Sequence, residues 1–230
     1  ARARAVRPGV QLVTMLELSL GAAPPRRILA VGCHSDDIEI GCGGLLLTLA
    51  AAHPEIAVTW VVLAAEGERE QEARRSAEAF LAGFGDHEIV THAFRDGFLP
   101  YSGAEVKESF EALKPIAPDL VLTHAGHDFH QDHRLAAELT WNTFRHHLIL
   151  EYEIPKYDGD LGRPNVFFNL TEDVARRKAK LVCEHFTSQS AKHWFDEELF
   201  LSLLRLRGME SGSPTRHAEA FFGRKLVLAG

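Results

Sequence analysis

Two short segments of the sequence carry side chains that bind metal ions in proteins. The first reads His34-Ser35-Asp36-Asp37. An imidazole and a carboxylate three positions apart, as His34 and Asp37 are, can bind one zinc ion or a similar divalent metal from a tight loop. Asp36 points in another direction, because neighbouring side chains diverge, and it is therefore available as a general base beside the metal.

The second segment, THAGHDFHQDHR, has a histidine at every third position. Those histidines are His124, His127, His130 and His133, with Asp128 and Asp132 between them. A predicted helix over residues 135–144 puts His133 at or near a rigid helix start, which suits a metal ligand. His130, one turn earlier, would lie beside the metal, where it can stabilise an oxyanion or donate a proton to a leaving amine. The spacing alone leaves open which of the two is the ligand.

The other polar residues of these segments have simpler explanations. Asp128 and Asp132 can orient the histidine rings by accepting their second N–H. We expect His124 and His127 to be solvated loop residues or helix caps, and not metal ligands. In the first segment, likewise, an aspartate after a strand commonly caps a helix. Two such segments at one crevice favour a metal site over these explanations.

The elements around the two segments alternate between strands and helices. Apolar runs predict strands over residues 28–31, 56–65, 88–94 and 119–123, and the stretches after them predict helices over residues 40–52, 68–84, 106–113 and 135–144. Such alternation indicates parallel βαβ units and a Rossmann-like, three-layer α/β fold with a mainly parallel sheet. The carboxyl ends of parallel strands lie at one edge of the sheet, so both segments are expected at the same crevice.

The last third of the sequence is less regular. It predicts a strand and a long structured loop over residues 148–168, helices over 172–186 and 196–206, and a closing strand over 220–228. We interpret residues 1–230 as a single domain with an N-terminal arm or helix over residues 1–25.

Composition indicates a cytoplasmic globular protein. The net charge of −7 supplies no basic surface for nucleic acid. Cys33, Cys42 and Cys183 show no Cys-x-x-Cys spacing, which argues against a disulfide framework and for a reducing compartment. Polar residues interrupt the apolar segment 10–23, so we expect no membrane span. Assembly into a homo-oligomer is left open by the sequence.

The two segments together resemble a known family. Residues 34–44, HSDDIEIGCGG, resemble the His-Pro-Asp-Asp signature of the LmbE-like deacetylases, also called the PIG-L family. Residues 127–134, HDFHQDHR, resemble that family's His-x-Asp-His signature, and the resemblance extends over residues 26–230. Known members are zinc-dependent hydrolases that remove an acyl group, usually acetyl, from the amide nitrogen of an N-acetylglucosamine-type sugar. The resemblance therefore implies a LmbE-like fold and a zinc-dependent N-deacetylase whose substrate is a small N-acetylated amino sugar or a glycoconjugate.

The resemblance also implies a role for each motif residue. The ligands it implies for Zn2+, or for another divalent transition metal, are His34, Asp37 and His133. The catalytic residues it implies are Asp36 as the base, His130 as the group that stabilises the oxyanion, and Asp132 as a residue that orients the histidine rings. The choice of His133 over His130 as the ligand comes mainly from the family.

Further matches to the family imply substrate contacts. Arg69 belongs to an Arg-x-x-Glu element, Asp96 follows the third predicted strand, and His185 lies in the segment EHFTSQ. Residues 156–158 are expected in the wall of the pocket.

The chain departs from the family pattern at two positions. Ser35 stands where the family usually has proline, which removes a constraint on φ, and Ile38 stands where glutamate is frequent. Cys33, directly before His34, is expected to pack in the interior and not to bind the metal.

Other functions explain fewer of these features. Hydrolysis of another N-acyl amide is the nearest alternative. A metal-dependent phosphoesterase would need more carboxylates to hold paired ions. A Rossmann-type nucleotide-binding module would need a G-x-G-x-x-G loop after the first strand, and the sequence has none there.

Overall fold

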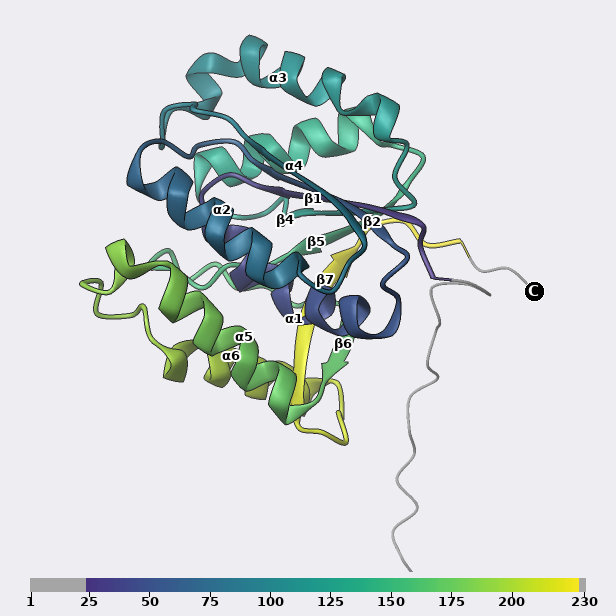
Figure 1. The fold of residues 1–230 in the computed structure, drawn as a ribbon, viewed down its shortest axis with the longest axis vertical. Coiled ribbons are helices and arrows are strands. Elements are labelled where there is room, and N and C mark those ends of the chain that lie inside the picture. The colour runs from purple at the N-terminus through teal and green to yellow at the C-terminus, as the bar shows by residue number, and fades with distance from the viewer. Residues whose placement is uncertain (1–23, 228–230) are drawn as a thin grey trace, which may run out of the picture.

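The computed structural model describes residues 24–227, whose arrangement is drawn in Figure 1. Seven strands form one sheet in the order β3-β2-β1-β4-β5-β7-β6. Helices cover both faces of this sheet, so the predicted three-layer α/β fold is confirmed. The predicted N-terminal arm lies, up to residue 23, outside the described residues.

Five strands form the parallel part of the sheet. They are β1 (Arg27–Gly32), β2 (Ala57–Val62), β3 (Asp86–Thr91), β4 (Leu120–His124) and β5 (Leu148–Tyr152). The strand β1 pairs with β2 on one side and with β4 on the other. The two motif segments follow β1 and β4, and they are therefore neighbours at the carboxyl edge of the sheet, as predicted.

The remaining two strands are antiparallel. The strand β7 (His217–Gly223) lies between β5 and β6 (Val166–Leu170) and runs antiparallel to both. The predicted closing strand over residues 220–228 is therefore wrong in its bounds. Pairing with β5 and β6 ends at Gly223, and the apolar side chains of Leu226 and Val227 beyond it are exposed.

The α-helices form the two outer layers. One layer contains α1 (Asp37–Ala52), α2 (Glu68–Leu81), α5 (Glu172–His185) and α6 (Glu197–Glu210), and the other contains α3 (Gly103–Ala112) and α4 (Gln131–Thr143). Short 3-10 turns occur at η1 (Leu99–Ser102), η2 (Lys114–Ile116) and η3 (Thr187–Gln189). None of the helices formed by residues 24–227 has the length and the apolar sequence that a membrane crossing requires.

Alternate residues of β1 face the two layers. Ile28 and Ala30 pack in the core shared with α1 and α5, whereas Leu29 and Val31 pack in the core shared with α3 and α4. Because β1 is buried on both faces, it appears in the sequence as a continuous apolar run.

Helix α1 is broken after its first turn, at Cys42, where φ is −143° and ψ is 16°. A regular helix would join the Gly44 amide to the Ile40 carbonyl. Instead, the Gly44 amide donates to Glu219 Oε1 at 2.6 Å, and the Ile40 carbonyl accepts from Lys178 Nζ at 2.7 Å. Lys178 and Glu219 are buried and pair with each other at 2.6 Å. This ion pair therefore replaces one backbone hydrogen bond of the helix that begins at the site.

Two glycines of α1 allow the helix to approach its neighbours closely. A Cβ atom on Gly41 would lie 2.2 Å from Cδ2 of Tyr152, and one on Gly44 would lie 2.5 Å from Cδ1 of Leu170. A larger residue at Gly41 would displace either the helix or the buried ring of Tyr152.

Candidate active site

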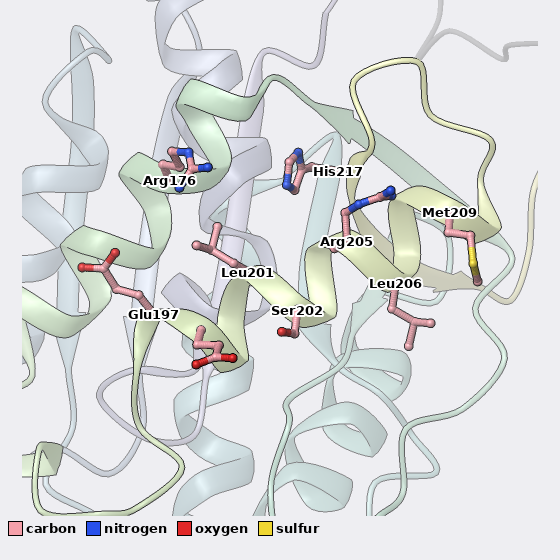
Figure 2. A pocket seen from close by; sticks show the side chains of 9 residues that line it. Arg176, Glu197, Leu201, Ser202, Arg205, Leu206, Met209 and His217 are labelled. Carbon is pink, nitrogen blue, oxygen red and sulfur yellow. The ribbon is translucent and has the colours of Figure 1, made fainter.

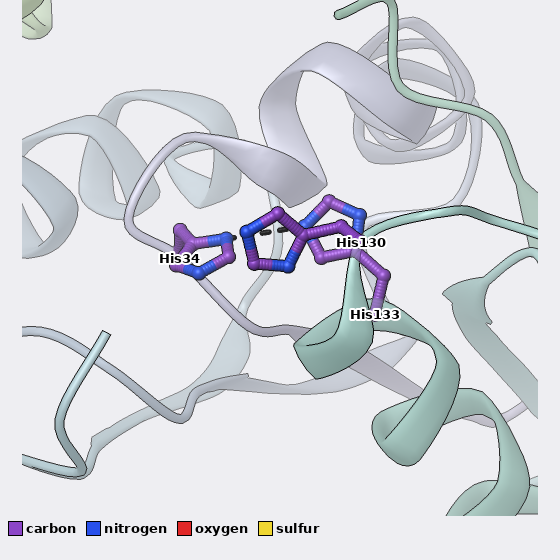
Figure 3. Close-up of side chains that lie close together, drawn as sticks. All are labelled: His34, His130 and His133. Atoms are coloured by element: carbon purple, nitrogen blue, oxygen red, sulfur yellow. Dashed lines mark hydrogen bonds between the residues drawn. The ribbon is translucent and has the colours of Figure 1, made fainter. Parts of the chain in front are cut away.

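Three predicted residues bring ligand atoms together at the carboxyl edge of the sheet. His34 follows β1, Asp37 begins α1, and His133 lies in the first turn of α4. Nδ1 of His34 lies 3.1 Å from Nε2 of His133 and 3.3 Å from Oδ2 of Asp37. The third side of this triangle, from Nε2 of His133 to Oδ2 of Asp37, measures 3.5 Å. Figure 3 shows the rings of His34 and His133 close together, with His130 beside them.

The size of the triangle suits a tetrahedral metal ion. Bonds of about 2.0–2.2 Å place the ligand atoms of tetrahedral zinc about 3.3–3.6 Å apart. The sides of 3.1, 3.3 and 3.5 Å come close to that spacing. Two nitrogens and one oxygen also leave a fourth position for water or substrate, as in catalytic zinc sites. The residues present therefore fit such an ion.

His133 is held from behind by a carboxylate. Its Nδ1 lies 2.9 Å from Oδ2 of Asp128, which also accepts from Nζ of Lys156 at 2.8 Å. With the Nδ1 proton directed at Asp128, the lone pair of Nε2 points to the triangle. Burial and the neighbouring His124 lower the pKa of His133 to about 4, so the ring is neutral at pH 7. Neutral imidazole is the form that binds a metal ion.

Carboxylates surround His34. Its Nε2 lies 3.0 Å from Oδ1 of Asp96 and 3.4 Å from Oδ2 of Asp132, while its Nδ1 faces Asp37. Burial favours the neutral ring, but these carboxylates outweigh burial and raise the pKa of His34 well above its usual value. A metal ion at Nδ1 would have to displace a proton from this ring.

Asp36 lies beside the triangle without capping helix α1, although it occupies the N-cap position. Its Oδ1 accepts from Nη2 of Arg69 at 3.1 Å. Burial raises the pKa of Asp36, and the charge of Arg69 partly offsets that increase. The helix-cap explanation is therefore wrong for this side chain, and its partner is a residue that the resemblance had placed against the substrate.

His130 occupies the N-cap position of α4. Its Nδ1 accepts from the Asp132 amide at 3.3 Å, so the neutral ring carries its proton on Nε2. Burial, together with the charge of His34, lowers the pKa of His130. Its ring centroid lies 4.8 Å from that of His34 and 4.6 Å from that of His133. His130 therefore stands next to the triangle as a neutral hydrogen-bond donor.

Asp132 connects the second motif segment to the loop after β3. Its Oδ2 accepts from the Gly97 amide at 2.7 Å, and its Oδ1 accepts from the Leu99 amide at 3.1 Å. This loop carries Asp96, which is exposed and contacts His34. The carboxylate of Asp132 thus places Asp96 at the cluster and also faces the ring of His34.

His124 was expected to be a solvated loop residue or a helix cap, and this expectation is wrong. Its side chain is completely buried, because β4 extends one residue further than predicted. Nε2 of His124 accepts from the Cys33 amide at 3.0 Å and lies 3.2 Å from Oδ2 of Asp37. Its ring stacks on that of His133, with centroids 3.8 Å apart. His127 is exposed, as expected.

Several groups of donor atoms overlap in this cluster. Groups whose atoms lie within 4.8 Å of one another include His34, His130 and His133; His34, Asp96, His130 and Asp132; His124, Asp128 and His133; and Cys33, Asp37 and His124. Cys33 is fully buried, and burial raises the pKa of its thiol. The cluster therefore contains more possible metal ligands than the three residues of the triangle.

The segment EHFTSQ, residues 184–189, is linked to Asp36 through Ser188 and Arg69. Oγ of Ser188 accepts from Nη1 of Arg69 at 3.3 Å and donates to Oε2 of Glu72 at 2.6 Å. His185 ends α5, and within residues 24–227 it forms no hydrogen bond or ion pair with the cluster. Its substrate contact stays a prediction.

A groove of about 800 Å³ lies away from this cluster, along α6 and beside α5 and β7 (Figure 2). Its lining includes Leu201, Leu206 and Met209, and it contains none of the predicted site residues.

Part of the chain matches a known protein family. Residues 29–144, half of the chain, match the PIG-L family, described as GlcNAc-PI de-N-acetylase. This region contains both motif segments. No curated protein matches the sequence.

Solved structures share the fold at low sequence identity. The N,N'-diacetylchitobiose deacetylase from Pyrococcus horikoshii is 22% identical, with a TM-score of 0.67 over 86% of this chain and 83% of its own. The 4-carboxy-2-hydroxymuconate hydratase GalB from Pseudomonas putida KT2440 is 16% identical, with a TM-score of 0.68 over 89% of this chain and 98% of its own. The zinc-inhibited form of the teicoplanin deacetylase Orf2 is 15% identical, with a TM-score of 0.65 over 85% and 96%. These likenesses show the fold, and the match over residues 29–144 shows that the chain belongs to the PIG-L, or LmbE-like, family.

Proposed function

We propose that this protein is a metal-dependent hydrolase that removes the N-acetyl group from an N-acetylglucosamine-type amino sugar or glycoconjugate. The triangle of His34, Asp37 and His133, with the carboxylate of Asp36 beside it, carries the proposal. Membership of the PIG-L family supports the same reaction. Two proteins of this fold are deacetylases of diacetylchitobiose and teicoplanin, and a third is a hydratase. The reaction is therefore argued from the site and the family, since one fold can host several chemistries.

His34, Asp37 and His133 are the residues that would hold Zn2+, or another divalent transition metal. Their atoms form a triangle of tetrahedral size, and Asp128 fixes the ring of His133. When bound in such a site, zinc lowers the pKa of its water toward about 7 and polarises the acyl carbonyl.

Asp36 would accept the proton of the attacking water. Its Oδ1 is engaged by Arg69, which leaves Oδ2 for the water. Because burial raises the pKa of Asp36, the carboxyl can hold this proton and then deliver it to the departing amine nitrogen. Acetate and a free amino sugar would result.

His130 would stabilise the oxyanion that forms from the acyl carbonyl. Its Nδ1 is occupied by the Asp132 amide, so Nε2–H is the available donor. A donor held in this way at a buried site stabilises the charge that develops as the amide is attacked.

The test is acetate release from N-acetylglucosamine and a panel of its glycosides, by protein stripped of metal and then given one equivalent of zinc. We expect release only with the metal. If zinc binds tightly and no glycoside is cleaved, the amino-sugar assignment is wrong and other N-acyl amides become the candidates. Two tightly bound ions per chain together with cleavage of a phosphate ester would identify a phosphoesterase instead.

A further inference from the structure

The exposed large aromatic side chains of residues 24–227 lie on segments at the carboxyl edge of the parallel strands. They follow β3, β4 and β5, the strands whose carboxyl ends border the site. Their exposed fractions are 40% for Phe98, 82% for Tyr101, 63% for Phe129 and 70% for Tyr157. We call these four residues the aromatic rim. Exposed apolar side chains that gather in this way mark binding surfaces.

Hydrogen bonds join the segments of the aromatic rim to the histidine cluster. The amide of Phe129, directly before His130, donates to Oδ2 of Asp160 at 2.6 Å, which ties it to the loop of Tyr157. In that same loop, Lys156 donates to the carboxylate that supports His133. The segment of Phe98 and Tyr101 is held by Asp132, as described above. The rim is therefore continuous with the candidate active site.

Several polar groups beside the rings are engaged within the protein, although the hydroxyl of Tyr101 has no hydrogen-bond partner among residues 24–227. Lys156 pairs with Asp160 at 2.8 Å, and the hydroxyl of Tyr157 lies 3.2 Å from Nδ1 of His193. The guanidinium carbon of Arg95 lies 3.6 Å from the ring centroid of Phe98. Phe98 and Phe129 have no polar side-chain atom and the hydroxyl of Tyr157 is paired, so most of the exposed surface of these rings is apolar, which favours an apolar ligand over one rich in hydroxyl groups.

From this arrangement, and resting on the proposed function, we propose that the aromatic rim binds an apolar aryl or alkyl portion of the substrate beyond its N-acetylated sugar. None of the four rim residues belongs to the groups that could hold the metal ion. Binding energy from such a remote contact acts equally on the bound substrate and on its transition state, so it lowers KM and leaves kcat nearly unchanged.

The kinetic test compares the methyl and the 2-naphthyl β-glycosides of N-acetylglucosamine. We expect the KM of the naphthyl substrate to be lower by a factor of at least about 10, because a ring that loses contact with water gains that much affinity. Phe129→Ala and Tyr157→Ala should bring the ratio of the two KM values close to one, whereas Tyr157→Phe should retain it.

Met209→Ala is the matched control, because Met209 is 64% exposed and lies in the distant groove of Figure 2. It should leave the KM ratio as it is in the natural protein. Equal KM values for the two substrates in the natural protein, or a ratio that Phe129→Ala and Tyr157→Ala do not change, would overturn the proposal.

A binding measurement separates this proposal from the proposed function. The probe is 2-naphthyl β-glucoside, which has no amide to cleave, and its binding is followed by calorimetry. The double variant Phe129→Ala/Tyr157→Ala should bind it at least about tenfold more weakly than the natural protein, and Met209→Ala should not. If this result holds while no N-acetyl sugar is cleaved, the proposed function fails and the apolar site stands.

Two other outcomes would assign the rim differently. A KM that falls with the length of a chito-oligosaccharide, without any preference for the naphthyl group, would show a saccharide site and overturn the apolar assignment. A dimer in solution that the double variant converts to monomers, with an unchanged KM ratio, would show that the rim is an interface between copies of the chain and would also overturn it.

Discussion

Nη2 of Arg69 lies 3.1 Å from Oδ1 of Asp36, and this contact joins helix α2 to the loop that carries the first motif segment. Arg69 is itself held by Glu72, because Nη1 of Arg69 donates to Oε2 of Glu72 at 3.1 Å. The guanidinium carbon of Arg69 also lies 5.4 Å from the ring centroid of Phe186. The arginine is thus fixed on the side opposite Asp36. It orients the carboxylate that we propose as the base.

Replacing this arginine should slow the reaction without releasing the metal. In Arg69→Met, Asp36 loses the partner that orients it, and we expect kcat to fall by about 10- to 100-fold while zinc affinity stays within about twofold. Steady-state kinetics and zinc titration measure the two effects. Arg75→Met, on the exposed side of the same helix, is the control and should behave like the natural protein. An unchanged kcat in Arg69→Met would contradict the positioning role.

The base itself is tested by Asp36→Asn. The amide keeps the size of the side chain and still accepts from Arg69, but it cannot take a proton from water. We expect turnover to fall by about 10² to 10⁴ and one zinc ion per chain to remain bound. Loss of zinc in this variant would mean that Asp36 is a ligand, and normal turnover would mean that another group is the base.

The ligand assignment is tested by a pair of histidine variants from one segment. His133→Ala should weaken zinc binding by more than about 100-fold, since even residues that only support a ligand cost about 10- to 100-fold. His127→Ala should bind zinc normally, because His127 is exposed and apart from the triangle. Competition with a chelator of known affinity measures both. Equal affinities in the two variants would reject His133 as a ligand.

Glu72 makes stability depend on pH in the acidic range. Burial opposes its charge, but hydrogen bonds from Ser188 and Arg69 outweigh burial and lower the pKa of Glu72. The folded state therefore binds this proton less readily than the unfolded state does. The resulting stabilisation is complete above the unfolded pKa of about 4.5 and is lost as the pH falls through the folded value.

The variant Glu72→Gln should lower the free energy of unfolding by about 1–3 kcal/mol at pH 7 and flatten its fall below about pH 4.5. Urea denaturation at a series of pH values measures this. Glu68→Gln, exposed in the first turn of the same helix, is the control. A variant with the same acid dependence as the natural protein would show that other carboxylates cause it.

Loss of the buried ion pair of Lys178 and Glu219, which contacts the break in α1, should destabilise the protein far more than loss of an exposed pair. Glu219→Gln leaves the buried charge of Lys178 unpaired, which we expect to cost about 3–5 kcal/mol of unfolding free energy. Glu172→Gln breaks the exposed pair with Arg176 and should change the free energy of unfolding far less, because solvent screens that pair. Urea denaturation compares them. Similar small losses in both variants would show that the pair does not support the break in α1.

Local patterns were sufficient for the parallel half of the fold. The run from Ile28 to Val31 is apolar on both faces because β1 is buried on both faces, and the same holds for Leu120 to Leu122 of β4. Alternation of such runs with helical stretches implies which strand ends share an edge, and this alone predicts that the two motif segments lie together. The antiparallel part was harder, because the insertion of β7 between β5 and β6 depends on which distant segments pair.

For the site, the sequence by itself determined which types of metal-ligand side chain each segment carries and how they are spaced. Residues a few positions apart along the chain must also lie close together in space. The tertiary structure alone decided the rest. It buried His124 against His133 and turned Arg69 toward Asp36. It also paired the Ile40 carbonyl, at the break in α1, with Lys178, which is 138 residues away. Such contacts depend on packing between distant elements, where a difference of one residue in a strand end or of one turn in a helix changes which side chains meet.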